Sequence, residues 1–158
     1  MLDLLWLVPA WSLAGFLVLA TLGRRLPRPA ATSVGVGSVG LSTLTAGAVA
    51  VGFLELPPSG RVYTQSLWHW LAIPGFRAPV GLYLDALALV MTVVVAFVGL
   101  LIHLYSTEFM RDDPGYSRFF AYMNLFVASM LTLVLADNLL LLYLGWEGVG
   151  LCSYLLIG

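Results

Sequence analysis

The chain has 158 residues, of which 61% are hydrophobic and 9% are charged, and its formal net charge is -1. Its mean hydropathy of +0.98 lies far outside the range of a soluble globular domain. This composition excludes a water-soluble enzyme, and nothing in it resembles the clustered basic face of a nucleic-acid-binding protein. We therefore expect an all-α integral membrane protein with five spans.

The first two apolar runs predict two membrane helices joined by a basic linker, GRRLPRP. The first run covers about 4–22 and carries Pro9 in its first turns, where a missing amide donor does least harm. The second run covers about 30–54 and is rich in small residues. Four of them recur every four residues and predict close contact with another helix: Ser38, Ser42, Ala46 and Ala50.

The segment between the second and third spans, about 56–80, has a different composition, rich in Pro, Gly and aromatic residues. Part of it, RVYTQSLWHWL, alternates, and Pro74-Gly75 is a turn signal, so we predict a short hairpin on the outer side of the membrane. Trp68 and Trp70 suit the headgroup level of a bilayer. His69 is expected to be a solvated residue without a role.

The third predicted span covers about 82–105, and its polar and small residues fall on one helical face. They follow at spacings of seven, four, three and four: Asp85, Thr92, Ala96, Gly99 and His103. This face should point into protein. We expect a structural role for Asp85, close to the outer end of the helix. His103 is either an interfacial polar anchor or a member of a proton relay, because imidazole titrates near neutral pH.

The fourth and fifth spans, about 119–136 and 139–158, are joined by a tight turn at Asp137-Asn138 and should form an antiparallel pair. The fourth has a polar face of its own, which predicts hydrogen bonds between helices. That face consists of Asn124, Ala128 and Thr132, with Ser129 alongside. Cys152 in the fifth span is expected to pack as a small hydrophobe.

The fifth span places one carboxylate, Glu147, near the middle of its apolar run. An acidic group at that depth costs about 2.5–3.5 kcal/mol, so it is a candidate functional residue. Tyr143 and Tyr154 fall on the same helical face and could support it by hydrogen bonding. We therefore predict that Glu147 is a buried acid that binds and releases a proton. The alternative is a neutral acid that only hydrogen-bonds a neighbouring helix.

The surroundings expected for Glu147 come from glycines and from the polar faces of the third and fourth spans. Three glycines should thin the helix around the carboxyl group: Gly145, Gly148 and Gly150. The sequence has no Lys, and its seven Arg lie in loops or at interfaces. No cation of this chain is therefore placed to pair with Glu147 at mid-membrane.

The distribution of arginine predicts the orientation. With the N-terminus outside, five arginines lie in inner loops and two in outer ones, as the positive-inside rule requires. The inner set is Arg24, Arg25, Arg28, Arg111 and Arg118, and the outer set is Arg61 and Arg77. Gly158 ends the sequence inside an apolar run, so we expect the N-terminal portion of a longer protein.

The stretch from about 103 to 158 resembles a known family. Its segments HLYSTEFM, DDPGYSRFFAYMNLF and GWEGVGLCSYLLIG, with GLYLDALAL upstream, are similar to the antiporter-like subunit L of respiratory complex I, which is chain 5 in mitochondria. The resemblance implies a proton-pumping membrane-arm subunit of NADH:quinone oxidoreductase. It also implies that Glu147 pairs with a lysine on the family's seventh helix, beyond these residues.

The resemblance implies a non-redox role within a larger translocase. Other membrane-arm subunits and the bilayer would be its partners, and NADH and quinone would bind elsewhere in the complex. The sequence itself predicts no cofactor or metal site, because it has no GxGxxG motif and no Cys cluster. An all-Arg chain rich in Ala, Gly and Val favours a bacterial inner membrane over a mitochondrial one.

Two other functions remain open at this stage. One is a related transport module: the large subunit of a multi-subunit cation/proton antiporter, or the membrane partner of an inorganic-carbon uptake complex. The other is a scaffold subunit in which Glu147 is only a helix contact.

Overall fold

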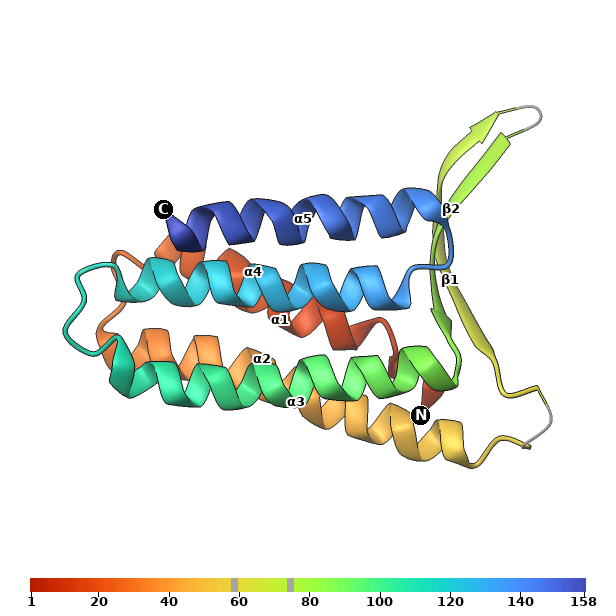
Figure 1. Ribbon diagram of the computed structural model, residues 1–158, viewed down its shortest axis with the longest axis horizontal. Helices are drawn as coiled ribbons and strands as arrows, with labels where there is room; N and C mark the ends of the chain where they lie inside the picture. The colour runs from red at the N-terminus through yellow and green to blue at the C-terminus, as the bar shows by residue number, and fades with distance from the viewer. Residues whose placement is uncertain (58–59, 74–75) are drawn as a thin grey trace.

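A computed structural model of the chain describes residues 1–57, 60–73 and 76–158. Long helices lie side by side, and a two-stranded antiparallel sheet crosses them at one end of the bundle (Figure 1). In chain order the elements are η1 (Leu2–Leu4), α1 (Leu7–Leu22), α2 (Arg28–Leu54), β1 (Tyr63–Ile73), β2 (Phe76–Leu84), α3 (Ala86–Phe109), α4 (Tyr116–Leu135) and α5 (Leu139–Ile157). Among the described residues, five helices are long and apolar enough to cross a membrane, which confirms the predicted helical membrane fold.

The third helix is displaced from its predicted position. We expected it at about 82–105, whereas α3 begins at Ala86 and ends at Phe109. The reason is the strand before it: Leu82 and Leu84 pair with β1 and are not available to a helix. Asp85 then caps α3, because its Oδ1 accepts a hydrogen bond of 2.7 Å from the amide of Ala88. This is a structural role, as expected for Asp85.

The predicted hairpin is present, and it ties distant parts of the chain together. Its strands pair from Tyr63↔Leu84 to Ile73↔Phe76. The side chain of Gln65 bonds to the backbone of Asp3 and Trp6 at the start of the chain. Asn138, at the start of α5, donates to the carbonyl of Pro79 at 2.8 Å. The turn expected at Pro74-Gly75 and the side chain of His69 lie outside the described residues.

The fourth helix is the centre of the bundle, and the fifth lies at its edge. Helix α4 contacts α1, α2, α3 and α5, whereas α5 packs on α4. Accordingly 39% of the apolar window of α4 is buried in the chain, against 17% of that of α5. Figure 1 shows α5 along one side of the bundle, with the hairpin extending past it. One face of α5 is therefore without a partner among the described residues.

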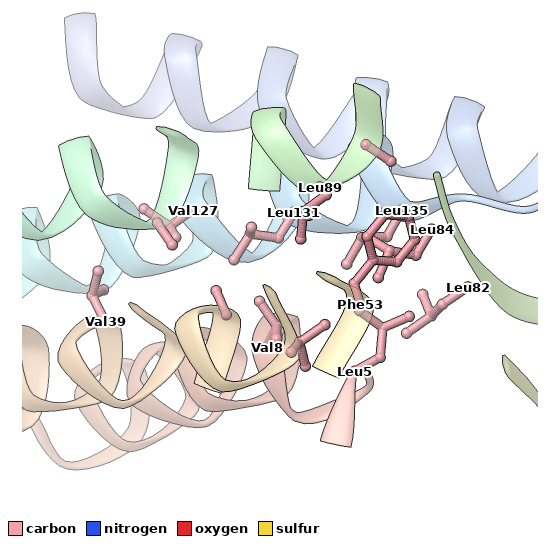
Figure 2. Packing of buried hydrophobic residues seen from close by; sticks show 14 residues of the cluster. Leu5, Val8, Val39, Phe53, Leu82, Leu84, Leu89, Val127, Leu131 and Leu135 are labelled. Carbon is pink, nitrogen blue, oxygen red and sulfur yellow. The ribbon is translucent and has the colours of Figure 1, made fainter. Parts of the chain in front are cut away.

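An apolar cluster at the hairpin end fixes the hairpin to the helices. Figure 2 shows Leu5, Phe53, Leu84 and Leu135 converging there, each at most 1% exposed. They come from the chain start, α2, β2 and α4. The cluster lies at the end of the bundle, where the helices end. It therefore holds the hairpin at this end, away from the polar residues deeper in the bundle.

Candidate functional site

Glu147 lies near the middle of α5, roughly 12 Å along the axis from Leu139 at 1.5 Å per residue. The helix packs on α4 through the opposite face, which holds Leu141, Gly145 and Cys152. Glu147 itself is exposed. Within the described chain α5 turns this face away from α4, so the burial of the carboxyl group by the bilayer or by further parts of the protein stays a prediction. Cys152 is 0% exposed, as expected for a small residue packed against a neighbouring helix.

Two tyrosines share the exposed face of α5 with Glu147, as the spacing predicts. Tyr143 is 61% exposed and Tyr154 is 74% exposed. Tyr143 precedes Glu147 by one turn of α5, so the two side chains are neighbours on this face. The face therefore presents one carboxyl group and two phenols outward, at mid-span. We refer to Tyr143, Glu147 and Tyr154 together as the carboxyl face.

Two of the three glycines thin α5 on the side of α4 and allow the close backbone approach that such residues are expected to give. A Cβ atom at Gly145 would lie 2.7 Å from the backbone nitrogen of Leu133, and one at Gly148 would lie 2.5 Å from Ser129 Oγ. Both glycines thus allow α5 to approach α4 closely, on the side opposite the carboxyl face. Gly150 has open space around its Cβ position.

A second polar site lies inside the bundle formed by α1 to α4. At its centre, Asn124 is fully buried, and its Oδ1 accepts a hydrogen bond of 2.5 Å from Ser38 Oγ. Its Nδ2 donates to the carbonyls of Phe120 at 3.0 Å and Gly35 at 3.2 Å. The amide therefore links α4 to α2, which confirms the predicted role of Asn124 in helix contact.

His103 is the third helix's contribution to this site. It is 0% exposed, and its Nδ1 lies 2.8 Å from the carbonyl oxygen of Gly99. Because a carbonyl only accepts, we assign the proton to Nδ1. Nε2 is then an acceptor 3.4 Å from Asn124 Nδ2, and it shares the two amide hydrogens with the carbonyls of Phe120 and Gly35. The ring meets Phe120 edge-on, with centroids 5.9 Å apart. We refer to Ser38, His103 and Asn124 as the amide cluster.

The first helix reaches the amide cluster through Gly15. A Cβ atom there would overlap Ser38 Oγ and lie 2.6 Å from Asn124 Oδ1. All four helices of the bundle therefore meet at this point. The face predicted to point into protein on α3 does so, since Thr92, Ala96, Gly99 and His103 are buried.

Further polar contacts that the sequence did not predict extend through the bundle. Ser12 Oγ and Ser42 Oγ are 2.8 Å apart, and both residues are buried. Thr43 Oγ1 donates to the carbonyl of Ala96 at 2.9 Å. The only available signal for Ser12 was a polar residue within the otherwise apolar first span. The interior of this bundle is thus held by hydrogen bonds as well as by apolar packing.

Helix α4 separates the two sites. Asn124 and Leu133 are nine residues apart, so they point in opposite directions from the helix axis, and Leu133 contacts Gly145 of α5. Thr132 bonds only within its own helix, to Ala128 O. The expectation that the polar faces of the third and fourth spans surround Glu147 is therefore wrong. The structure does not bring His103 and Glu147 together.

No cation meets the carboxyl face in the described part of the chain. The ion pair that the structure contains joins Arg111 to Glu108 at 3.2 Å, and both side chains are exposed beyond the end of the bundle core. The arginines of the first linker are also exposed at that end. Glu147 is thus a mid-span acid whose neighbours within the described chain are tyrosines.

Comparison with known proteins identifies the relatives of this chain. A family model described as NADH-ubiquinone oxidoreductase (complex I), chain 5 N-terminus, matches residues 70–120. NADH-quinone oxidoreductase subunit L of Pseudomonas aeruginosa is 54% identical over 99% of this chain and 26% of that protein. The Escherichia coli subunit L is 52% identical over 99% of this chain and 25% of that protein.

A solved structure is similar as well. The Mrp complex from a Dietzia species contains a chain that matches 97% of this chain, with a TM-score of 0.67 and 29% identity, over 16% of its own length. The chain spans about a quarter of the length of the curated relatives that it matches. The predicted resemblance is thereby confirmed: over nearly its whole length this chain matches the N-terminal quarter of the subunit L, or chain 5, proteins of complex I.

Proposed function

We propose that this chain forms part of a proton-translocating membrane subunit of NADH:quinone oxidoreductase, in which Glu147 binds and releases a proton. The observation that carries the proposal is a carboxyl group at mid-span, on a helix face without a partner among the described residues. Holding an acid at that depth is costly, so such residues mark ion pathways by default. The similarity to subunit L of two bacteria supports the assignment to this complex.

The position of Glu147 supports a pairing with a group outside the described residues. A cation brought close to the carboxyl group favours its ionised form, and withdrawal of that cation favours the neutral acid. Proton binding can then follow the position of the partner. Tyr143 is one turn from Glu147 on the same face of α5, and its hydroxyl group can donate to the carboxylate or accept from the neutral acid. Tyr154 lies two turns further along the same face, roughly 10.5 Å from Glu147 along the axis, and would extend the polar surface in that direction.

His103 has a different place in this proposal. Both of its ring nitrogens are occupied by the interior of the bundle. This favours the polar-anchor alternative over membership of a proton relay. We expect redox cofactors, NADH and quinone to bind to other subunits, and we expect a bacterial inner membrane as the location, with the N-terminus outside.

The test uses the full-length protein in its assembled complex. Glu147→Gln keeps the size and hydrogen bonding of the side chain but removes its titratable proton. We expect vesicles of this variant to lose NADH-driven proton uptake while complex assembly is retained. Glu55→Gln is the matched control, because it makes the same chemical change at an exposed carboxylate at the end of α2. Unaltered pumping by assembled Glu147→Gln would overturn the proposal.

A second candidate is the large subunit of a multi-subunit cation/proton antiporter. The observation that favours it is the similarity to the Mrp complex chain, at 29% identity. The two functions differ in their driving reaction. Proton movement that depends on NADH oxidation supports the first, whereas cation-driven proton exchange without NADH supports the second.

A further inference from the structure

A groove on the outside of the bundle lies between α1 and α2, and two of its wall residues, Gly15 and Ser38, also reach the amide cluster. It has a volume of about 460 Å³. Its walls are mostly apolar or small: Trp11, Ala14, Gly15 and Val18 on α1, and Ser33, Val34, Gly37, Ser38 and Leu41 on α2. The two helices are antiparallel neighbours, so the groove runs along the bundle axis.

Gly37 keeps this groove open. The residue is exposed, and a Cβ atom built there meets nothing within 4 Å. The Cβ position of Gly37 is therefore not occupied by contact between the described helices. At Gly15, by contrast, a Cβ atom would collide with the amide cluster. An apolar groove of this kind on a membrane helix pair can accept a lipid chain.

The end of the groove near the α1–α2 linker is strongly basic. Arg24, Arg25 and Arg28 lie within or beside the linker, and all three side chains are exposed. The linker, GRRLPRP, contains no acidic residue, and none of the three pairs with a carboxylate within residues 1–57, 60–73 and 76–158. Arg28 is roughly 7.5 Å along the axis from Ser33 at the end of the groove. Guanidinium groups at that level match a lipid phosphate.

A larger groove of about 660 Å³ between α1 and α5 provides a contrast. Its lining side chains are uncharged among those that the structure describes, from Trp6 on one wall to Gly148 on the other. Among these side chains it offers no feature that selects a headgroup. Of the two grooves, the smaller one is therefore the one with a basic end among the described residues.

We propose that the groove between α1 and α2 binds one anionic phospholipid, with an acyl chain against Gly37 and its phosphate at Arg24, Arg25 and Arg28. The three positive charges and the absence of acidic residues in the linker select an anionic headgroup over a zwitterionic one. Each arginine near an anionic surface strengthens binding about five-fold.

The test uses the full-length protein in its purified complex, reconstituted into phosphatidylcholine vesicles. The probe is phosphatidylglycerol with a photoreactive diazirine on one acyl chain, and cross-linked positions are mapped by mass spectrometry. We expect the lipid to label residues within 11–18 of α1 and 33–41 of α2. A matched phosphatidylcholine probe should label these residues roughly ten-fold less. Equal labelling by both probes would overturn the proposal, as would labelling of α2 only outside this range.

Two variants separate the chain-binding wall from the headgroup site. Gly37→Leu fills the groove and should reduce the cross-linking at least five-fold, whereas Gly47→Leu, also in open space on α2, should leave it unchanged. Replacement of all three arginines by Gln should remove the preference for phosphatidylglycerol, and replacement by Lys should retain most of it. Removal of the arginine charges can disturb membrane insertion and so prevent assembly of the Gln variant. In that case the Gly37→Leu variant tests the proposal by itself. Unchanged labelling of Gly37→Leu would contradict the proposal.

Discussion

The amide cluster and the carboxyl face are both polar sites at membrane depth, but they differ in how their groups are satisfied. In the amide cluster, Ser38, His103 and Asn124 find their hydrogen-bond partners inside the bundle. On the carboxyl face, Glu147 and Tyr154 point away from every helix that α5 contacts in the described chain. A satisfied site stabilises a fold, whereas an unsatisfied acid at mid-span requires a further partner.

This difference separates stability from transport. Groups whose donors and acceptors are all paired resist rearrangement, because every movement breaks a bond in a water-free interior. A carboxyl group without a fixed partner can exchange protons as its surroundings change. We therefore expect changes in the amide cluster to affect folding, and changes at Glu147 to affect proton movement.

The largest expected effect on stability is at Gly15. Gly15→Ala places a Cβ atom against Ser38 Oγ and within 2.6 Å of Asn124 Oδ1, so it should overpack the cluster and break their hydrogen bond. We expect a loss of about 3 kcal/mol in the free energy of unfolding. Thermal unfolding of the full-length protein in detergent would measure it. Gly47→Ala, in open space on α2, is the control and should be neutral or slightly stabilising.

The next effect concerns the attachment of α5. Asn138 caps this helix by accepting from the amides of Leu140 and Leu141, and it bonds the hairpin through Pro79. Asn138→Ala should cost about 1–2 kcal/mol and increase hydrogen exchange in α5 while the α1–α4 bundle stays protected. Leu139→Ala, at an 81% exposed neighbour, should change neither. Equal loosening of the bundle would show that the two regions are not independent.

His103 gives the most direct test of the comparison. His103→Gln keeps a donor and an acceptor but no titratable ring, and should cost about 1 kcal/mol. We expect the assembled variant to pump protons at nearly the unaltered rate, in contrast to Glu147→Gln. If pumping is lost while assembly and stability are retained, His103 belongs to a proton relay and the division between the two sites fails.

The smallest expected effect is at the pair Ser12 and Ser42, whose hydroxyl oxygens are 2.8 Å apart. A double-mutant cycle with Ser12→Ala and Ser42→Ala should give a coupling of about 0.6 kcal/mol, as is typical of hydrogen bonds between membrane helices. A coupling near zero would mean that the bundle is held by packing alone at this level.

The sequence predicted much of the fold because its signals are local. Hydropathy located the spans, and helical spacing grouped Thr92, Ala96, Gly99 and His103 on one face, which is buried as expected. The start of α3 could not be placed, because Leu82 and Leu84 are apolar enough for a span and only pairing with β1 assigns them to a strand. Hydropathy does not distinguish these alternatives.

By itself the sequence determined which residues share a helix face and that Glu147 lies at mid-span without a cation on this chain. Only the tertiary structure decided which neighbour each face meets. It places Gly145 and Gly148 against α4 and so turns Glu147 outward, and it directs Asn124 to the side of α4 away from α5. The physical reason is that spacing fixes the angles between residues on one helix, whereas the rotation of that helix against its neighbours depends on packing between segments far apart in the chain.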